Sequence, residues 1–299
     1  LFDPPTAYLA AYQQPTGSRF GGDALYNAEN RKYGSMLTYF YTAKDGKEKD
    51  SLTLKIYDGD RQIRTLKRKA PKETGFHRWY WSLNEKGVER PSRSESKRKR
   101  EPSGVTVKPG SYKVVLESKD NSSETEVTVI TDPRLEISQK AIDDSYNYSK
   151  KIEGYTEQTT AAVNQLKASK KTLSSYKSRI EKKDKEAHKE LLETIAEHTK
   201  QIDSILDIFI GREDKRQGIV RNPENSVLKR IYSASRYVRS RPTGITTTEE
   251  KLLEHLKNDL QTALQQTNAF YDEHWEAVKA KIEAVELSDF KAIERFEID

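Results

Sequence analysis

The hydrophobic pattern of this chain changes at Thr131–Arg134. Before that point apolar and polar residues alternate, which is typical of strands, and after it apolar residues recur every three or four positions, which is typical of helices. At 299 residues the chain is long enough for two domains that each bury a core. The sequence therefore predicts an α+β protein with a β-domain over residues 31–133 and a helical bundle over residues 134–299.

The first part of the chain, residues 1–30, follows neither pattern. Pro4-Pro5, Pro15 and Gly21-Gly22 interrupt any regular element, so this part is expected to be irregular. The chain starts without Met and without a basic and then apolar leader, so no signal peptide is visible. We expect a fragment in which residues 1–30 lead in from a missing upstream domain.

Short alternating runs separated by turn residues fill the predicted β-domain. Leu52, Leu54 and Ile56 share one face of such a run, and the Asp58-Gly59-Asp60 sequence after it predicts a hairpin turn. About seven strands in roughly 100 residues are typical of an immunoglobulin-like or fibronectin-III-like β-sandwich. The expected strands are Tyr33–Thr42, Leu52–Tyr57, Gln62–Leu66, Phe76–Leu83, Val105–Val107, Ser111–Ser118 and Thr125–Ile130.

Apolar residues recur at heptad spacing after Ser138. The row through Ile152, Leu166 and Ile180 predicts one helix of about forty residues. Three long helices and one short helix joined by turns are typical of an antiparallel bundle. After this first helix, the others are expected from about Asp184 to Gly211, from Asn222 through Val238, and from an N-cap at Thr246–Thr248 to Val285.

Aromatic residues are concentrated on the expected strands. Trp81 lies at mid-strand between Trp79 and Leu83 at a spacing of two, which predicts that it is buried. Tyr80 could instead present an exposed ring that stacks on a sugar.

Three other tyrosines could form the same kind of platform, namely Tyr33, Tyr39 and Tyr41. Packing in a core or an interface is the favoured interpretation of these aromatic residues, because aromatic residues at the strand period normally face a core.

The residue types exclude several kinds of chemistry. The chain has no Cys, which excludes disulfides, thiolate zinc sites and cysteine nucleophiles. His198 and His274 are expected to face inward on their helices, but no third ligand follows at helical spacing, so no metal and no cofactor is expected. No pair of carboxylates is marked out for glycosidase chemistry, and no apolar run is long enough to cross a membrane. The sequence therefore predicts no catalytic site.

Positive charge is concentrated in the β-domain, because residues 1–133 carry a net charge of +6 and residues 134–299 a net charge of zero. A basic run lies in a polar segment between two expected strands and resembles a nuclear-import or nucleic-acid-binding sequence. The run has no interleaved aromatic residue that could stack on a base, which favours a solvated loop. Its basic residues are Arg93, Lys97, Arg98, Lys99 and Arg100.

An ordered series of short motifs resembles the C-terminal region of exported bacterial proteins with a sortilin-type, BNR-like β-propeller. The start of the chain resembles the segment that leaves the last propeller blade, and the later motifs resemble an entry strand, a Trp-containing strand, a turn and strand, and the link to a helical region. These motifs are Leu1–Tyr8, Asn27–Tyr39, Gly75–Leu83, Lys108–Val114 and Asp132–Arg134.

This resemblance implies an immunoglobulin-like sandwich and a helical bundle that follow a propeller in a larger protein. Such proteins are often labelled glycosyl hydrolases, but the resemblance assigns no catalytic residue to this chain. It implies a periplasmic, cell-surface or secreted location of the Bacteroidetes type.

The sequence leads to three functional hypotheses. The first is a non-catalytic accessory region that packs on or presents its own upstream propeller, or that binds another protein. The second is a carbohydrate-binding or glycan-processing module that uses exposed aromatic residues. The third is a nucleic-acid-binding protein that uses residues 93–100.

Overall fold

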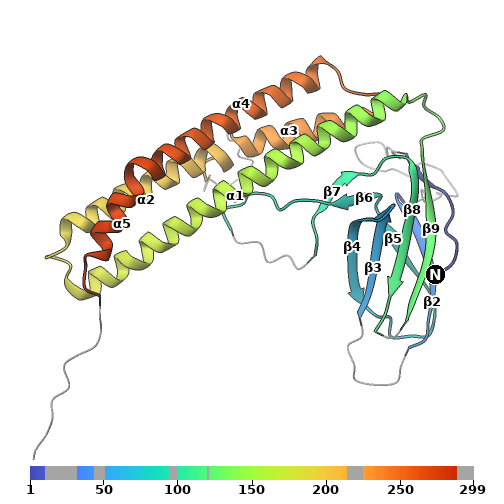
Figure 1. The fold of residues 1–299 in the computed structure, drawn as a ribbon, viewed down its shortest axis with the longest axis horizontal. Helices are drawn as coiled ribbons and strands as arrows, with labels where there is room; N and C mark the ends of the chain where they lie inside the picture. Colours follow the sequence, from blue (N-terminus) through green and yellow to red (C-terminus); the bar gives the residue numbers. More distant parts are fainter. Residues whose placement is uncertain (11–31, 44–50, 95–99, 120, 214–224, 288–299) are drawn as a thin grey trace, which may run out of the picture. The chain divides into compact units, whose positions relative to one another are not determined.

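The computed structural model describes six stretches of the chain, in which strands come first and helices follow (Figure 1). It is an α+β structure, as the sequence predicts. The described stretches are residues 1–10, 32–43, 51–94, 100–119, 121–213 and 225–287.

The chain divides into two compact units. Unit 1 comprises Leu1–Glu89, Ser96–Gly154 and Ser235–Glu250, and unit 2 comprises Arg90–Glu95, Tyr155–Ala234 and Lys251–Asp299. Unit 1 therefore contains every strand of the described residues together with parts of three helices. The domain boundary expected at residue 133 stays a prediction.

The strands of unit 1 form one five-stranded sheet and two strand pairs. The order in the larger sheet is β1-β9-β8-β3-β4, in which β1 runs parallel to β9 and the other neighbours are antiparallel. The strand pairs are β2-β5 and β6-β7. The strands are β1 (Ala7–Leu9), β2 (Ser35–Tyr41), β3 (Ser51–Asp58), β4 (Arg61–Lys69), β5 (Gly75–Trp81), β6 (Asn84–Lys86), β7 (Ser103–Thr106), β8 (Gly110–Glu117) and β9 (Ser122–Thr131).

The predicted hairpin between β3 and β4 is confirmed. Leu52, Leu54 and Ile56 are buried on one face of β3, and the chain turns back between Asp58 and Arg61. Gly59 makes this turn possible with a φ of 57°, a conformation that costs glycine little.

One apolar core lies beneath the five-stranded sheet and the β2-β5 pair. Trp81 is 0% exposed in it, as predicted, and its ring meets Tyr112 edge to face with centroids 5.3 Å apart. The indole N–H donates to the carbonyl of Asn84 at 3.0 Å, so the polar end of the side chain is satisfied as well.

Two strands differ from the expected set. β1 lies within residues 1–30, which we expected to be irregular. β6 lies in the polar segment between two expected strands, where no strand was expected. Each strand has only three residues, which is too short for an alternating pattern to be recognised. Ala7 is fully buried, so the start of the chain contributes to the core.

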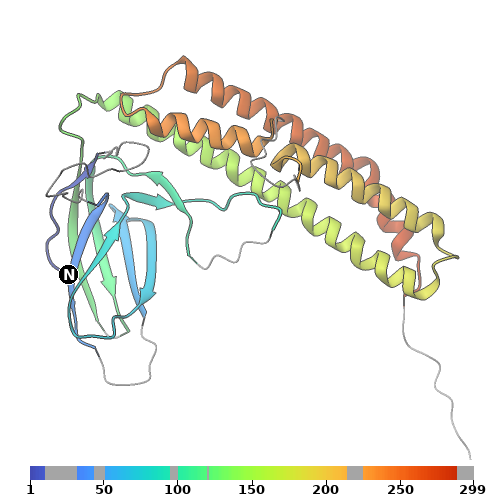
Figure 2. The same ribbon diagram turned by 180° about the vertical axis from the view of Figure 1, so that it is seen from behind.

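The described part of the helical region contains four helices, and a π-helical turn divides the last of them into α4 and α5. Figure 2 shows α2 running beside the part of α1 that belongs to unit 2, and Lys170 of α1 pairs with Asp203 of α2 at 2.6 Å. The helices are α1 (Gln139–Asp184), α2 (Lys189–Ile210), α3 (Val227–Ser240), α4 (Thr247–Phe270) and α5 (Glu276–Glu283).

The expected start of the short helix at Asn222 lies outside the described residues. The predicted N-cap of α4 is confirmed, because the backbone N–H of Thr246 donates to the carboxylate of Glu249 at 2.9 Å. The fourth helix is not continuous to Val285: a π-helical turn at Tyr271–Trp275 separates α4 from α5. Heptad spacing does not distinguish such a turn from an α-helical one.

Replacement of the buried indole tests the core. Trp81→Ala should lower the free energy of unfolding by about 3–5 kcal/mol, because it empties a large aromatic position. Urea denaturation followed by circular dichroism measures this loss. Phe76→Ala is the matched control: its side chain is 71% exposed, so the change should stay within about 0.5 kcal/mol. Equal losses in the two variants would contradict the position of Trp81 in the core.

Candidate functional site

One face of the β2-β5 pair is covered by the core and the other faces solvent. Alternation along the strands sends Leu37, Tyr39 and Trp81 inward. The outward positions are paired across the strands in register, with Phe40 opposite Phe76 among them. We call the six outward residues the β2-β5 outer face: Met36, Thr38, Phe40, Phe76, Arg78 and Tyr80.

Three phenylalanines form an exposed aromatic cluster at one end of this face. Phe76 is 71% exposed, Phe40 51% and Phe2 48%. The ring of Phe76 lies 5.3 Å from that of Phe40 and 5.7 Å from that of Phe2, measured between centroids. The backbone N–H of Phe2 donates to the carbonyl of Thr38 at 3.0 Å, which holds the third ring beside the strands. Contiguous exposed apolar groups of this kind mark interaction sites.

The charged groups at the β2-β5 outer face are cationic. Arg78 is exposed on it, and the ammonium of Lys32 lies 5.6 Å from the centroid of the Tyr80 ring. None of the six residues of the face carries a carboxylate. The face therefore combines aromatic surface with positive charge.

The tyrosines singled out from the sequence occupy three different environments. Tyr39 is 1% exposed in the core, so it cannot serve as a sugar platform; it faces inward because it shares the phase of Leu37. Tyr41 packs half-buried against the same core, and Tyr80 lies half-buried on the outer face. Tyr33 is 42% exposed and lies outside β2.

The basic run is only partly described. Arg93 donates to the carboxylate of Asp207 and to the carbonyl of Gly211, so its charge is paired within unit 2. Arg100 is exposed. Lys97, Arg98 and Lys99 lie outside the described residues, and nucleic-acid binding through this run stays a prediction.

Sequence reasoning missed the exposed phenylalanines. Phe40 and Phe76 are one residue out of phase with the inward positions of their own strands, and this was the signal that could have marked them. Phe2 offered no such signal, because it precedes the first strand and meets the ring of Phe76 only through the fold.

A buried carboxylate lies elsewhere in unit 1. Glu85 of β6 is 5% exposed. Arg61 donates to its two oxygens at 3.0 and 3.4 Å, and the Tyr146 hydroxyl donates to one of them at 2.7 Å. The Lys150 ammonium lies 3.4 Å from the other oxygen and 2.5 Å from the carboxylate of Glu153. This cluster joins the strands to the first turns of α1.

The surroundings of Glu85 keep it ionised. Burial alone would raise its pKa, but hydrogen bonds from Arg61 and Tyr146 and the positive charges of Lys150 and Arg61 lower the pKa below its ordinary value. Burial and the hydrogen bond to Glu85 raise the pKa of Tyr146. Glu85 thus acts as an acceptor whose oxygens are already occupied, which suits a structural ion pair better than acid–base catalysis.

The two inward histidines of the sequence prediction are brought together in unit 2. The imidazole rings of His198 and His274 lie 5.6 Å apart between centroids, and the ring of Phe270 contacts both. Nδ1 of His198 lies 2.8 Å from the carbonyl of Thr194. Across the described stretches, no three histidine or carboxylate side chains are grouped as metal ligands would be.

The chain has no match among protein-family models, curated proteins or solved structures. Among the described residues, no helix combines the length and the apolar character that crossing a membrane requires.

The hydrogen bonds and ion pairs of Glu85 predict that the stability of the chain depends on pH. The pKa of Glu85 is lower in the folded than in the unfolded chain. The carboxylate therefore contributes to the free energy of unfolding at pH values above its unfolded pKa of about 4.3, and this contribution is lost as the pH falls through its folded pKa. Glu85→Gln should lower the free energy of unfolding at pH 7 by about 1–3 kcal/mol and reduce its decline below about pH 4.5.

Urea titrations between pH 3 and pH 7 measure this effect. Glu117→Gln is the control, since Glu117 forms a more exposed pair with Lys55 and should contribute at most about 1 kcal/mol. An unchanged pH profile in Glu85→Gln would rule out the assigned role of the buried carboxylate.

Proposed function

We propose that this chain is a non-catalytic interaction region that binds a protein through the β2-β5 outer face. The observation that carries the proposal is the contact between three exposed rings, those of Phe2, Phe40 and Phe76. Interfaces are enriched in aromatic residues and Arg, and this face offers both. The partner surface should be apolar at its centre and carry carboxylates opposite Arg78 and Lys32.

The fold within this proposal is an immunoglobulin-like sandwich followed by a helical bundle. A single core beneath the larger sheet and the β2-β5 pair supports the sandwich. Rows of buried apolar residues on α1 and α2 support the bundle, among them Leu166, Leu173 and Ile202.

The partner that we propose first is a β-propeller of the same exported protein. The resemblance of the short motifs in the chain to propeller-associated proteins supports it. A location in the periplasm or at the cell surface follows from the same proposal.

The binding test uses any β-propeller that the reading frame upstream of Leu1 proves to encode, and the absence of one would overturn this choice of partner. Phe76→Asp should weaken the association at least about 10-fold in isothermal titration calorimetry, because it places a charge at the centre of an apolar contact. Thr128→Asp is the matched control: it adds the same charge at an exposed position of β9 and should leave the affinity within about 2-fold.

Failure of the propeller to bind, or equal binding by Phe76→Asp and the parent chain, would overturn the proposal. The exposed rings also favour a second candidate, a carbohydrate-binding module, since such rings can stack on sugars. Binding of soluble oligosaccharides that Phe76→Asp abolishes would support that candidate instead. Turnover of glycosides, peptides or phosphoesters by the purified chain would contradict the absence of catalysis.

A further inference from the structure

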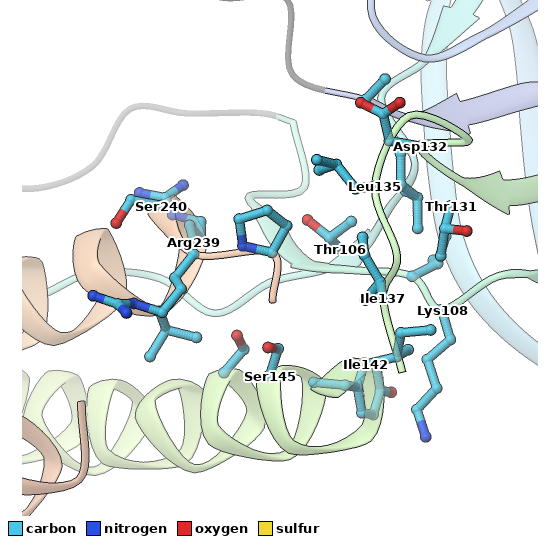
Figure 3. A pocket seen from close by; sticks show the side chains of 18 of the residues that line it. Thr106, Lys108, Thr131, Asp132, Leu135, Ile137, Ile142, Ser145, Arg239 and Ser240 are labelled. Atoms are coloured by element: carbon cyan, nitrogen blue, oxygen red, sulfur yellow. The ribbon is translucent and has the colours of Figure 1, made fainter. Parts of the chain in front are cut away.

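A cavity of about 760 Å³ lies within unit 1, and none of its described lining residues belongs to the β2-β5 outer face. Its walls come from Leu9 and Ala10, from Tyr33, from residues 105–108, from the link between β9 and α1 with the first turns of α1, and from the end of α3. Figure 3 shows Leu135 of the link and Ser145 of α1 directed into the space between these segments. The volume lies in the range of small-molecule sites.

The lining of the cavity is mainly apolar. Val105, Val107 and Val238 are buried in its walls, whereas Leu135 and Tyr33 keep 42% of their surface exposed. Apolar groups that line a concave space and stay accessible can bury an apolar part of a ligand.

One polar group beside the cavity has no hydrogen-bond partner among the described residues. It is the hydroxyl oxygen of Ser145, which is buried. A buried hydroxyl costs free energy unless it forms a hydrogen bond. A ligand with an oxygen or nitrogen near Ser145 would provide that bond.

The charged groups of the lining are mostly cationic: Lys108, Arg134, Arg239 and Arg241 against Asp132. Asp132 is already engaged, because Arg134 donates to its two oxygens at 2.8 and 2.6 Å and thereby lowers its pKa to about 2. The single carboxylate therefore does not favour a cationic ligand.

Two of the other cations are paired with carboxylates outside the lining. Lys108 pairs with Asp143 at 2.5 Å, and Arg241 lies 3.5 Å from the buried carboxylate of Glu249. Arg239 has no carboxylate partner among the described residues, and its Nε donates to the carbonyl of Ser235 at 3.3 Å. The remaining charge of the lining is thus positive and lies at Arg239.

We propose that this cavity binds an amphipathic organic anion, with its apolar part against Val105, Val107 and Leu135 and its acidic group toward Arg239 and Ser145. The site is independent of the interaction function proposed above, since it shares no residue with the β2-β5 outer face. A carboxylate and a phosphate both satisfy the chemistry of the head group.

Four probes with the same ten-carbon chain test the proposal by isothermal titration calorimetry below their critical micelle concentrations. Decanoate and decyl phosphate should bind with a stoichiometry of about one, and their relative affinities identify the preferred head group. Decanol and decyltrimethylammonium should bind at least about 10-fold more weakly, because they lack the negative charge.

Variants locate the binding site. Arg239→Glu should weaken binding of the tighter anion at least about 10-fold, whereas Arg236→Glu, one helical turn earlier on α3 and outside the lining, should leave it within about 2-fold. Ser145→Phe should block binding by filling the space, and circular dichroism verifies that each variant is folded. If Ser145→Phe does not fold, the pair of arginine variants decides.

Three results would overturn the proposal. They are the absence of saturable binding by both anions, equal binding of all four probes, and equal losses in Arg239→Glu and Arg236→Glu.

Discussion

The two-residue period of β2 and β5 controls both surfaces of this strand pair. Successive side chains point to opposite faces, so burial of Tyr39 and Trp81 places Phe40 and Phe76 in solvent. A shift of one residue in register would exchange the two sets and expose the indole. The core beneath the sheets therefore fixes the position of the aromatic cluster, and Phe2 completes this cluster through its backbone bond to β2.

The contact between the sheets is apolar, whereas β6 contacts the start of α1 through ion pairs and hydrogen bonds. Burying the carboxylate of Glu85 costs free energy, which is offset because Arg61, Tyr146 and Lys150 all supply donors or positive charge. Loss of Arg61 or Lys150 would weaken this compensation for the buried charge. The cluster therefore links β6 to the first turns of α1, and Tyr146 also lines the neighbouring cavity.

The β2-β5 outer face and the cavity differ in shape and therefore in the ligands that they can bind. A strand pair with exposed rings offers a broad contact area, as protein interfaces do. A concave space with buried apolar walls and a few polar groups suits a small molecule. Both sites combine apolar surface with positive charge, which Arg78 and Lys32 supply at the β2-β5 outer face and Arg239 supplies at the cavity.

Local patterns in the sequence determined the α+β class, the burial of Trp81 and the capped start of α4 at Thr246–Glu249, because each depends on residues only a few positions apart. The sequence did not reveal that Ala7–Leu9 would pair with β9, or that Glu85 would meet Tyr146. The cavity was equally hidden, since segments that are distant from one another in the chain line it. Alternation and heptad spacing record which face of an element is apolar. Only the tertiary structure decided which elements became neighbours, because that depends on the packing of all the apolar faces together.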